Sequence, residues 1–69
     1  MKKLYKNQKH SLYYLTKELN LDIKRLYRYA DGSVPVDKIP FSLIYDIAKV
    51  EGIEPMELFN EMKEYLGGK

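Results

Sequence analysis

The sequence predicts an all-α protein, a compact bundle of five short helices around one hydrophobic core. Apolar residues recur at spacings of three and four along most of the chain, as they do on one face of a helix. No stretch alternates polar and apolar residues as a half-buried strand does. Ser, Asp, Gly and Pro separate the apolar segments and supply helix starts and stops. A chain of 69 residues is expected to form a single domain over residues 1–69.

The first two helices are expected over residues 2–9 and 12–19. The helix over residues 2–9 is short and basic, with Leu4 and Tyr5 as its inward contacts. Ser11 is suited to cap the helix over residues 12–19, because its hydroxyl can accept a hydrogen bond from a free backbone N–H. In that second helix the tyrosines at positions 13 and 14 are expected to pack, with their hydroxyls at the surface.

A sharp turn is predicted at Asn20, where the apolar pattern is interrupted. Asn is the residue with a Cβ that most often adopts the left-handed conformation. Asp22 is placed to cap a third helix, over residues 22–30, which ends before Gly32.

The two faces of this third helix differ in chemistry, since each residue advances by about 100°. Leu26 and Tyr29 lie on one face, which is expected to pack inward. The opposite face carries two cations and a phenol in addition to one acid: Lys24, Arg28, Tyr27 and Asp31.

Two prolines exclude a continuous helix in the loop over residues 33–40. Asp37 is expected to cap the fourth helix, with Pro40 in its first turn and Gly52 at its end. The fifth helix begins at Pro55. The predicted core includes one or two residues of each helix after the first: Leu15, Leu19, Leu26, Ile44, Ile47 and Phe59.

The fifth helix has a wide apolar stripe, consisting of Leu58, Phe59, Met62, Tyr65 and Leu66. Either the stripe forms a homodimer through this C-terminal helix, or all of it packs within the monomer; the sequence favours neither. The tail over residues 67–69 is expected to fray.

Charge is unevenly distributed along the chain. Residues 1–28 contain eight basic and two acidic residues, a net charge of +6, whereas residues 29–69 contain four basic and eight acidic residues, a net charge of −4. A polyanion would be attracted to the basic half, which includes the outward face of the third helix. The plain alternative is two ordinary solvated faces.

Catalysis and metal binding have little support in the sequence. The chain has no cysteine, and its single histidine, His10, has no acid at a useful spacing. The acidic run is interpreted as a solvated face, because it lacks the ligand spacing of a calcium site: Glu51, Glu54, Glu57, Glu61 and Glu64. We expect the protein not to be an enzyme and to bind no cofactor or small-molecule ligand.

The basic N-terminus lacks the apolar run of a signal peptide, and no apolar segment is long enough to span a membrane, so a cytoplasmic protein is expected.

The predicted helices, their caps and the turn between the second and third helices together resemble the Cro/CI-type, or XRE-type, helix-turn-helix family of bacterial and phage DNA-binding regulators. The similarity covers nearly the whole chain and rests on the order and spacing of these residues: Ser11, Leu15, Leu19, Asn20, Leu21, Asp22, Leu26, Gly32, Ile47-Ala48, Gly52-Ile53 and Leu58-Phe59. Two positions depart from the family pattern. Leu12 stands where a Gln that touches the DNA backbone is common, and Asp31 where a basic or amide residue is frequent.

The resemblance implies a lambda-repressor-like fold with its helix-turn-helix at about residues 11–31. It also implies a sequence-specific DNA-binding transcriptional regulator, a repressor of bacterial, phage or mobile-element origin, with helix 22–30 in the major groove of double-stranded DNA. We expect base contacts from Ile23, Lys24, Tyr27 and Arg28. We expect phosphate contacts from Lys9, Ser11, Lys17, Arg25, Ser33 and Lys38.

A second function stays open, in which the same fold binds protein instead of DNA. An antirepressor or an inhibitor of a host defence complex would fit that description. Leu12, Asp31 and the low net charge of +2 are the features that favour it.

Overall fold

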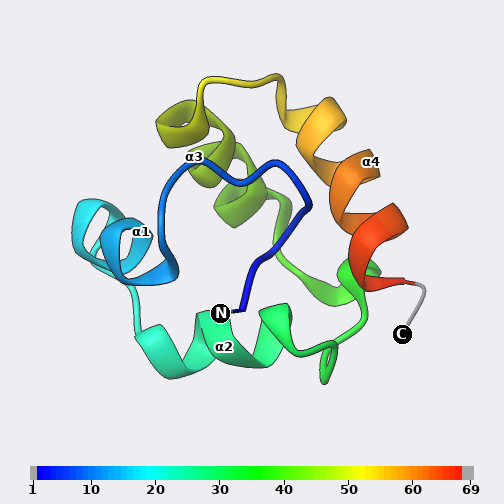
Figure 1. Cartoon of the computed structure of the whole chain (residues 1–69), viewed down its shortest axis with the longest axis horizontal. Helices are drawn as coiled ribbons and strands as arrows, with labels where there is room; N and C mark the ends of the chain where they lie inside the picture. Colours follow the sequence, from blue (N-terminus) through cyan, green and yellow to red (C-terminus); the bar gives the residue numbers. More distant parts are fainter. Residues whose placement is uncertain (1, 68–69) are drawn as a thin grey trace.

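The computed structural model describes residues 2–67 and contains four α-helices with no strand among these residues. The helices are α1 (Leu12–Leu19), α2 (Ile23–Ala30), α3 (Phe41–Glu51) and α4 (Pro55–Leu66), and a short 3-10 helix, η1 (Val36–Lys38), precedes α3. They enclose one core in a molecule of 27 × 24 × 21 Å (Figure 1). The all-α class is therefore confirmed, but the expected number of five α-helices is wrong.

The helix expected over residues 2–9 is the one that does not form. Residues 2–10 instead form an extended segment with one tight turn, here called the N-terminal segment, which crosses the ring of helices in Figure 1. The side chain of Gln8 accepts a hydrogen bond from Leu4 N–H at 2.7 Å and donates one to the His10 carbonyl at 2.5 Å. Leu4 and Tyr5 still point inward, with exposed fractions of 0% and 2%. The segment contributes these two side chains to the core without a helix to carry them.

The turn between α1 and α2 follows the sequence prediction closely. Ser11 Oγ accepts a hydrogen bond from Tyr14 N–H at 3.0 Å and caps α1. Asn20 has φ 55° and ψ 51°, which is the left-handed conformation expected for it. Asp22 Oδ1 accepts from Lys24 N–H at 2.9 Å and caps α2. The two helices pack directly against each other, so the turn fixes their relative orientation.

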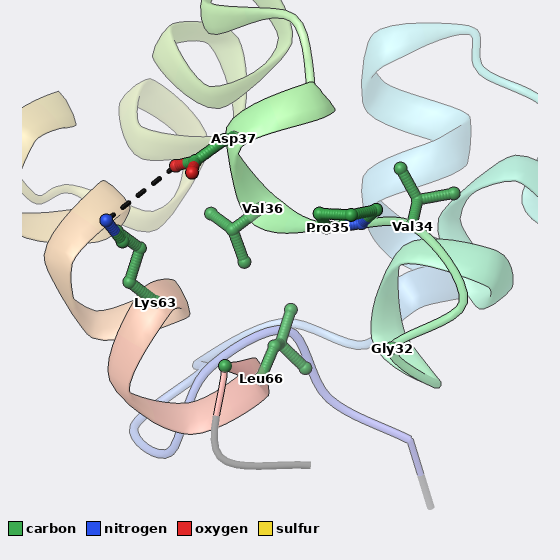
Figure 2. Close-up of a pocket in the computed structure, with 8 residues that line it drawn as sticks. Gly32, Val34, Pro35, Val36, Asp37, Lys63 and Leu66 are labelled. Atoms are coloured by element: carbon green, nitrogen blue, oxygen red, sulfur yellow. Dashed lines mark ion pairs between the residues drawn. The ribbon is translucent and has the colours of Figure 1, made fainter.

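The expected cap of α3 is wrong. Pro40 lies just before α3 rather than in its first turn, and no side chain caps this helix. Asp37 lies in η1, where its carboxylate forms an ion pair with Lys63 of α4 at 3.7 Å (Figure 2). Both side chains are more than half exposed, so the pair contributes little to stability.

Most of the predicted core is confirmed, including Leu15, Leu26, Ile44 and Ile47, which are at most 1% exposed. Leu19 and Phe59 were also expected there but are only partly buried.

The apolar stripe of α4 packs largely within the monomer. Leu58, Met62 and Leu66 are buried, and the partly buried Phe59 and Tyr65 pack against the core. The fraying expected for the tail concerns residues 68–69, which lie outside the described part of the chain.

Candidate nucleic-acid interface

The helix α2 has one buried face and one exposed face. Leu26 is 0% exposed and Tyr29 is 7% exposed, and both belong to the core. On the other side Lys24 and Arg28 are exposed, and Tyr27 is 45% exposed. The predicted division of this helix into two faces is confirmed.

Two open grooves border α2 and bring several of the predicted residues together. The first groove lies between the N-terminal segment, the start of α1 and α2, and it is lined by Lys2, Ser11, Leu12, Tyr13 and Tyr27. The second groove follows α1 to the start of α2, and its lining includes Tyr13, Lys17 and Ile23. Tyr13 lines both grooves, which therefore adjoin each other. Four predicted DNA contacts, Ser11, Lys17, Ile23 and Tyr27, thus share one side of the molecule.

Tyr13 itself was expected to pack, and that prediction is wrong, because its side chain is 59% exposed. The ammonium group of Lys17 lies 5.3 Å from the centre of its ring, within the range of a cation–π contact. The i, i+4 spacing of these two residues on the polar side of α1 was the signal in the sequence. Tyr14 is exposed as well, and its ring stacks on His10 at 4.6 Å between centroids.

Two of the predicted phosphate contacts are occupied by partners within the protein. Arg25 is half-buried, and its Nε donates a hydrogen bond to the Tyr29 hydroxyl at 2.9 Å. The hydroxyl of Ser33 donates to Asp31 Oδ1 at 2.5 Å, and the Ser33 backbone N–H donates to the same oxygen at 2.8 Å. The carboxylate of Asp31 is therefore hydrogen-bonded to the first residue of the loop after α2 and keeps its negative charge at the end of this helix.

The structure does not bring Lys9 and Lys38 into the grooves beside α2. Lys9 is exposed, and its backbone N–H donates to Glu51 Oε1 at 2.6 Å at the end of α3. Lys38 is exposed at the end of η1, which packs against α4.

Glu51 is the polar centre of the molecule, and the sequence analysis placed it wrongly on a solvated face. Its side chain is 0% exposed and accepts four hydrogen bonds from the N-terminal segment. The Tyr5 hydroxyl and Lys9 N–H donate to Oε1 at 2.5 and 2.6 Å. The His10 backbone N–H and ring Nδ1 lie 2.9 and 2.6 Å from Oε2. No pattern in the sequence near Glu51 predicts these hydrogen bonds, because their donors lie at least 41 residues away along the chain.

The two buried acids of this cluster have shifted pKa values. Burial alone would raise the pKa of the Glu51 carboxyl, but the hydrogen bonds from Tyr5, Lys9 and His10 outweigh burial and hold it below its ordinary value. Burial also raises the pKa of the Tyr5 hydroxyl far above its ordinary value, and the hydrogen bond to Glu51 adds to that rise. The pair is therefore a neutral phenol donating to a carboxylate.

Within residues 2–67, no three His, Asp or Glu side chains gather as metal ligands would. Each helix in this part of the chain is too short or too polar to cross a bilayer. The chain matches no protein-family model, no curated protein and no solved structure.

Proposed function

We propose that the protein is a sequence-specific DNA-binding regulator in which α1, the turn at Asn20 and α2 act as a helix-turn-helix. The observation that carries the proposal is the outward face of α2, where Lys24, Tyr27 and Arg28 are exposed beside one another while the opposite face packs on α1. A recognition helix needs this combination, because its inner side must be held rigidly while its outer side enters the major groove.

The charges around α2 support the same proposal. Lys2 and Lys17 line the two adjoining grooves, and Lys24 and Arg28 lie on the helix itself. Four of the eight acids of residues 29–69 lie on α4 or directly before it: Glu54, Glu57, Glu61 and Glu64. A polyanion would therefore meet α2 and α1 first, and the acidic side would repel it.

The side chains divide into two roles. Lys24 and Arg28 can donate to guanine O6 and N7, and Ile23 can contact a thymine methyl group. Ser11, which caps α1, and Lys17, which lies on α1, are assigned to phosphate, where contact fixes the register of the protein on DNA.

A single α2 makes few base contacts, so we propose that two copies bind a pseudo-palindromic site. Binding at a promoter would block or recruit the polymerase. A dimer through α4 would rest on Phe59 and Tyr65, the two members of its stripe that are only partly buried.

The test is selection of bound duplexes from a random pool, followed by affinity measurements on the selected sequence and on random DNA. We expect one sequence to be enriched and Lys24→Ala to weaken binding to it. Lys49→Ala, which removes an exposed lysine from α3, is the matched control and should leave the affinity unchanged. Failure to enrich any sequence, together with no salt-dependent binding to duplexes, would exclude this function.

The exposed tyrosines favour the second candidate, a protein-binding module. Tyr13, Tyr14 and Tyr27 are 43–59% exposed, and tyrosine is enriched in protein–protein interfaces. Basic residues around them would then meet an acidic partner. Absence of DNA binding in the experiment above would move this candidate to first place.

A further inference from the structure

We infer that the N-terminal segment forms a third part of the DNA-binding surface, in which Lys2 contacts a backbone phosphate and Glu51 holds the segment in position. The inference deepens the proposed function and rests on it. It assigns a role to residues that a helix-turn-helix does not itself contain.

The first groove places Lys2 on the DNA-facing side. Lys2 lines this groove together with Ser11 of the α1 cap and Tyr27 of the outward α2 face. Figure 1 shows the segment beginning beside α2 before it crosses toward α3 and α4. The groove has a volume of about 370 Å³ and is open to solvent. In the inferred complex a sugar–phosphate unit of a strand read by α2 lies in this groove, beside Lys2.

An extended segment contacts DNA well only if it is ordered before binding, because ordering it on the DNA would cost affinity. Leu4 and Tyr5 anchor the segment in the core, and Gln8 closes its turn through hydrogen bonds to Leu4 and His10. Lys2 lies only two residues before the first of these anchors, so its position is tied to theirs.

Glu51 joins both ends of the segment to α3. It accepts from Tyr5 near the beginning and from Lys9 and His10 at the end, where the chain enters α1. Its own side chain is fully buried and lies out of reach of any DNA strand. Glu51 is therefore a positioning residue, which acts on DNA through the segment and not by contact.

The first experiment compares Lys2→Ala with Lys3→Ala on the selected duplex between about 50 and 200 mM salt. Both variants lose one lysine from the same segment, but Lys3 lines none of the grooves described above. If Lys2 contacts phosphate, Lys2→Ala weakens binding and lowers the salt slope by about 0.9. Its deficit relative to the native protein then shrinks about threefold across this salt range. Equal effects of the two variants would overturn the inference.

The second experiment tests the role of Glu51 by a double-mutant cycle. Glu51→Gln keeps the side-chain shape, but the glutamine NH2 group takes one of two positions that both accept hydrogen bonds in the native protein, and it cannot accept them there. Tyr5→Phe removes one hydrogen bond and keeps the ring, and it serves if Glu51→Gln does not fold. Each variant, checked as folded by circular dichroism, should weaken DNA binding about two- to tenfold.

The same changes should have little effect in a Lys2→Ala background, because the segment then has no contact left to position. A purely structural role predicts the same fold-change in both backgrounds, and that result would overturn the inference. Arg28→Ala separates this failure from failure of the proposed function. If Arg28→Ala weakens binding to the selected duplex while the cycle shows no coupling, only the inference fails. If no variant alters DNA binding, the proposed function fails first.

Discussion

The Tyr5 hydroxyl donates a hydrogen bond of 2.5 Å to the carboxylate of Glu51, across 46 residues of sequence. Tyr5 belongs to the extended N-terminal segment, and Glu51 is the last residue of α3. This contact holds the N-terminal segment against the core, in the part of the chain where a further helix was expected. The backbone N–H groups of Lys9 and His10, at the end of that segment, are satisfied by this buried side chain.

Replacement of Glu51 should destabilise the protein strongly. Glu51→Ala leaves the buried Tyr5 hydroxyl and the part-buried Lys9 and His10 N–H groups without their acceptor. A buried unsatisfied group costs about 1–3 kcal/mol, and the part-buried groups add less because water can reach them. We expect a loss of about 2–4 kcal/mol in the free energy of unfolding, measured by urea denaturation. Glu57→Ala on the exposed side of α4 is the control and should change it by less than about 0.5 kcal/mol. A similar result for both variants would show that the cluster contributes nothing.

Acid should remove the stabilisation that Glu51 provides. The pKa of this carboxyl is lower in the folded protein than in the unfolded chain, so the unfolded state binds its proton first as the pH falls. The contribution is complete above about pH 5 and declines as the pH falls through and below the ordinary value of about 4.3. Urea titrations of the native protein and Glu51→Gln should therefore converge as the pH decreases from 6 to about 3. A constant difference between the two would contradict a lowered pKa.

Alkali should weaken the protein through Tyr5. Burial, the hydrogen bond to Glu51 and nearby glutamates raise the pKa of this hydroxyl, whereas in the unfolded chain it titrates near 10. Above that pH the unfolded state has lost a proton that the folded state keeps, so stability falls by up to about 1.4 kcal/mol per pH unit. Tyr5→Phe lacks this proton, and its unfolding free energy should decline less steeply between about pH 9.5 and 11. Parallel curves would show that Tyr5 titrates alike in both states.

The turn between α1 and α2 should respond to Asn20 in opposite directions. Asn20 has φ 55°, a conformation that costs an ordinary L-residue about 1–2 kcal/mol and glycine almost nothing. We expect Asn20→Ala to lower the unfolding free energy by about 1 kcal/mol and Asn20→Gly to leave it unchanged or raise it slightly. Thermal or urea denaturation of the two variants measures the difference. Equal stabilities would mean that the left-handed turn is not required.

The sequence predicts those features of this protein that depend on near neighbours. Ser11, Asn20 and Asp22 act within three or four residues of their own positions, and all three have the predicted roles. The periodicity of α2 gives its two faces for the same reason. The structure of residues 2–10 is not predicted in this way, because Leu4 and Tyr5 are buried by helices far along the chain. Glu51 is misplaced for the same reason, since its donors all come from that segment.

The candidate site divides in the same way. Lys24, Tyr27 and Arg28 follow from helix geometry alone, and the structure leaves them exposed together. The place of Lys2 in the first groove depends on the path of the whole N-terminal segment. A helical pattern centred on Leu4 gave no indication of that path.

Arg28 and Lys17 should affect DNA binding in different ways. Arg28 lies on the exposed face of α2, one turn after Lys24, and its planar guanidinium can donate two hydrogen bonds to one guanine. A pair of this kind contributes about 1–3 kcal/mol of discrimination between bases, so Arg28→Ala should weaken binding to the selected site far more than to random DNA. Lys17 lies on α1 beside the second groove and offers a single charge to phosphate. Lys17→Ala should weaken both affinities alike and reduce the salt slope by about one unit.

Affinities of both variants for both duplexes across a salt series distinguish base reading from phosphate contact, with Lys49→Ala as the control. An equal loss on both duplexes for Arg28→Ala would show that this side chain does not read bases, whatever its effect on affinity.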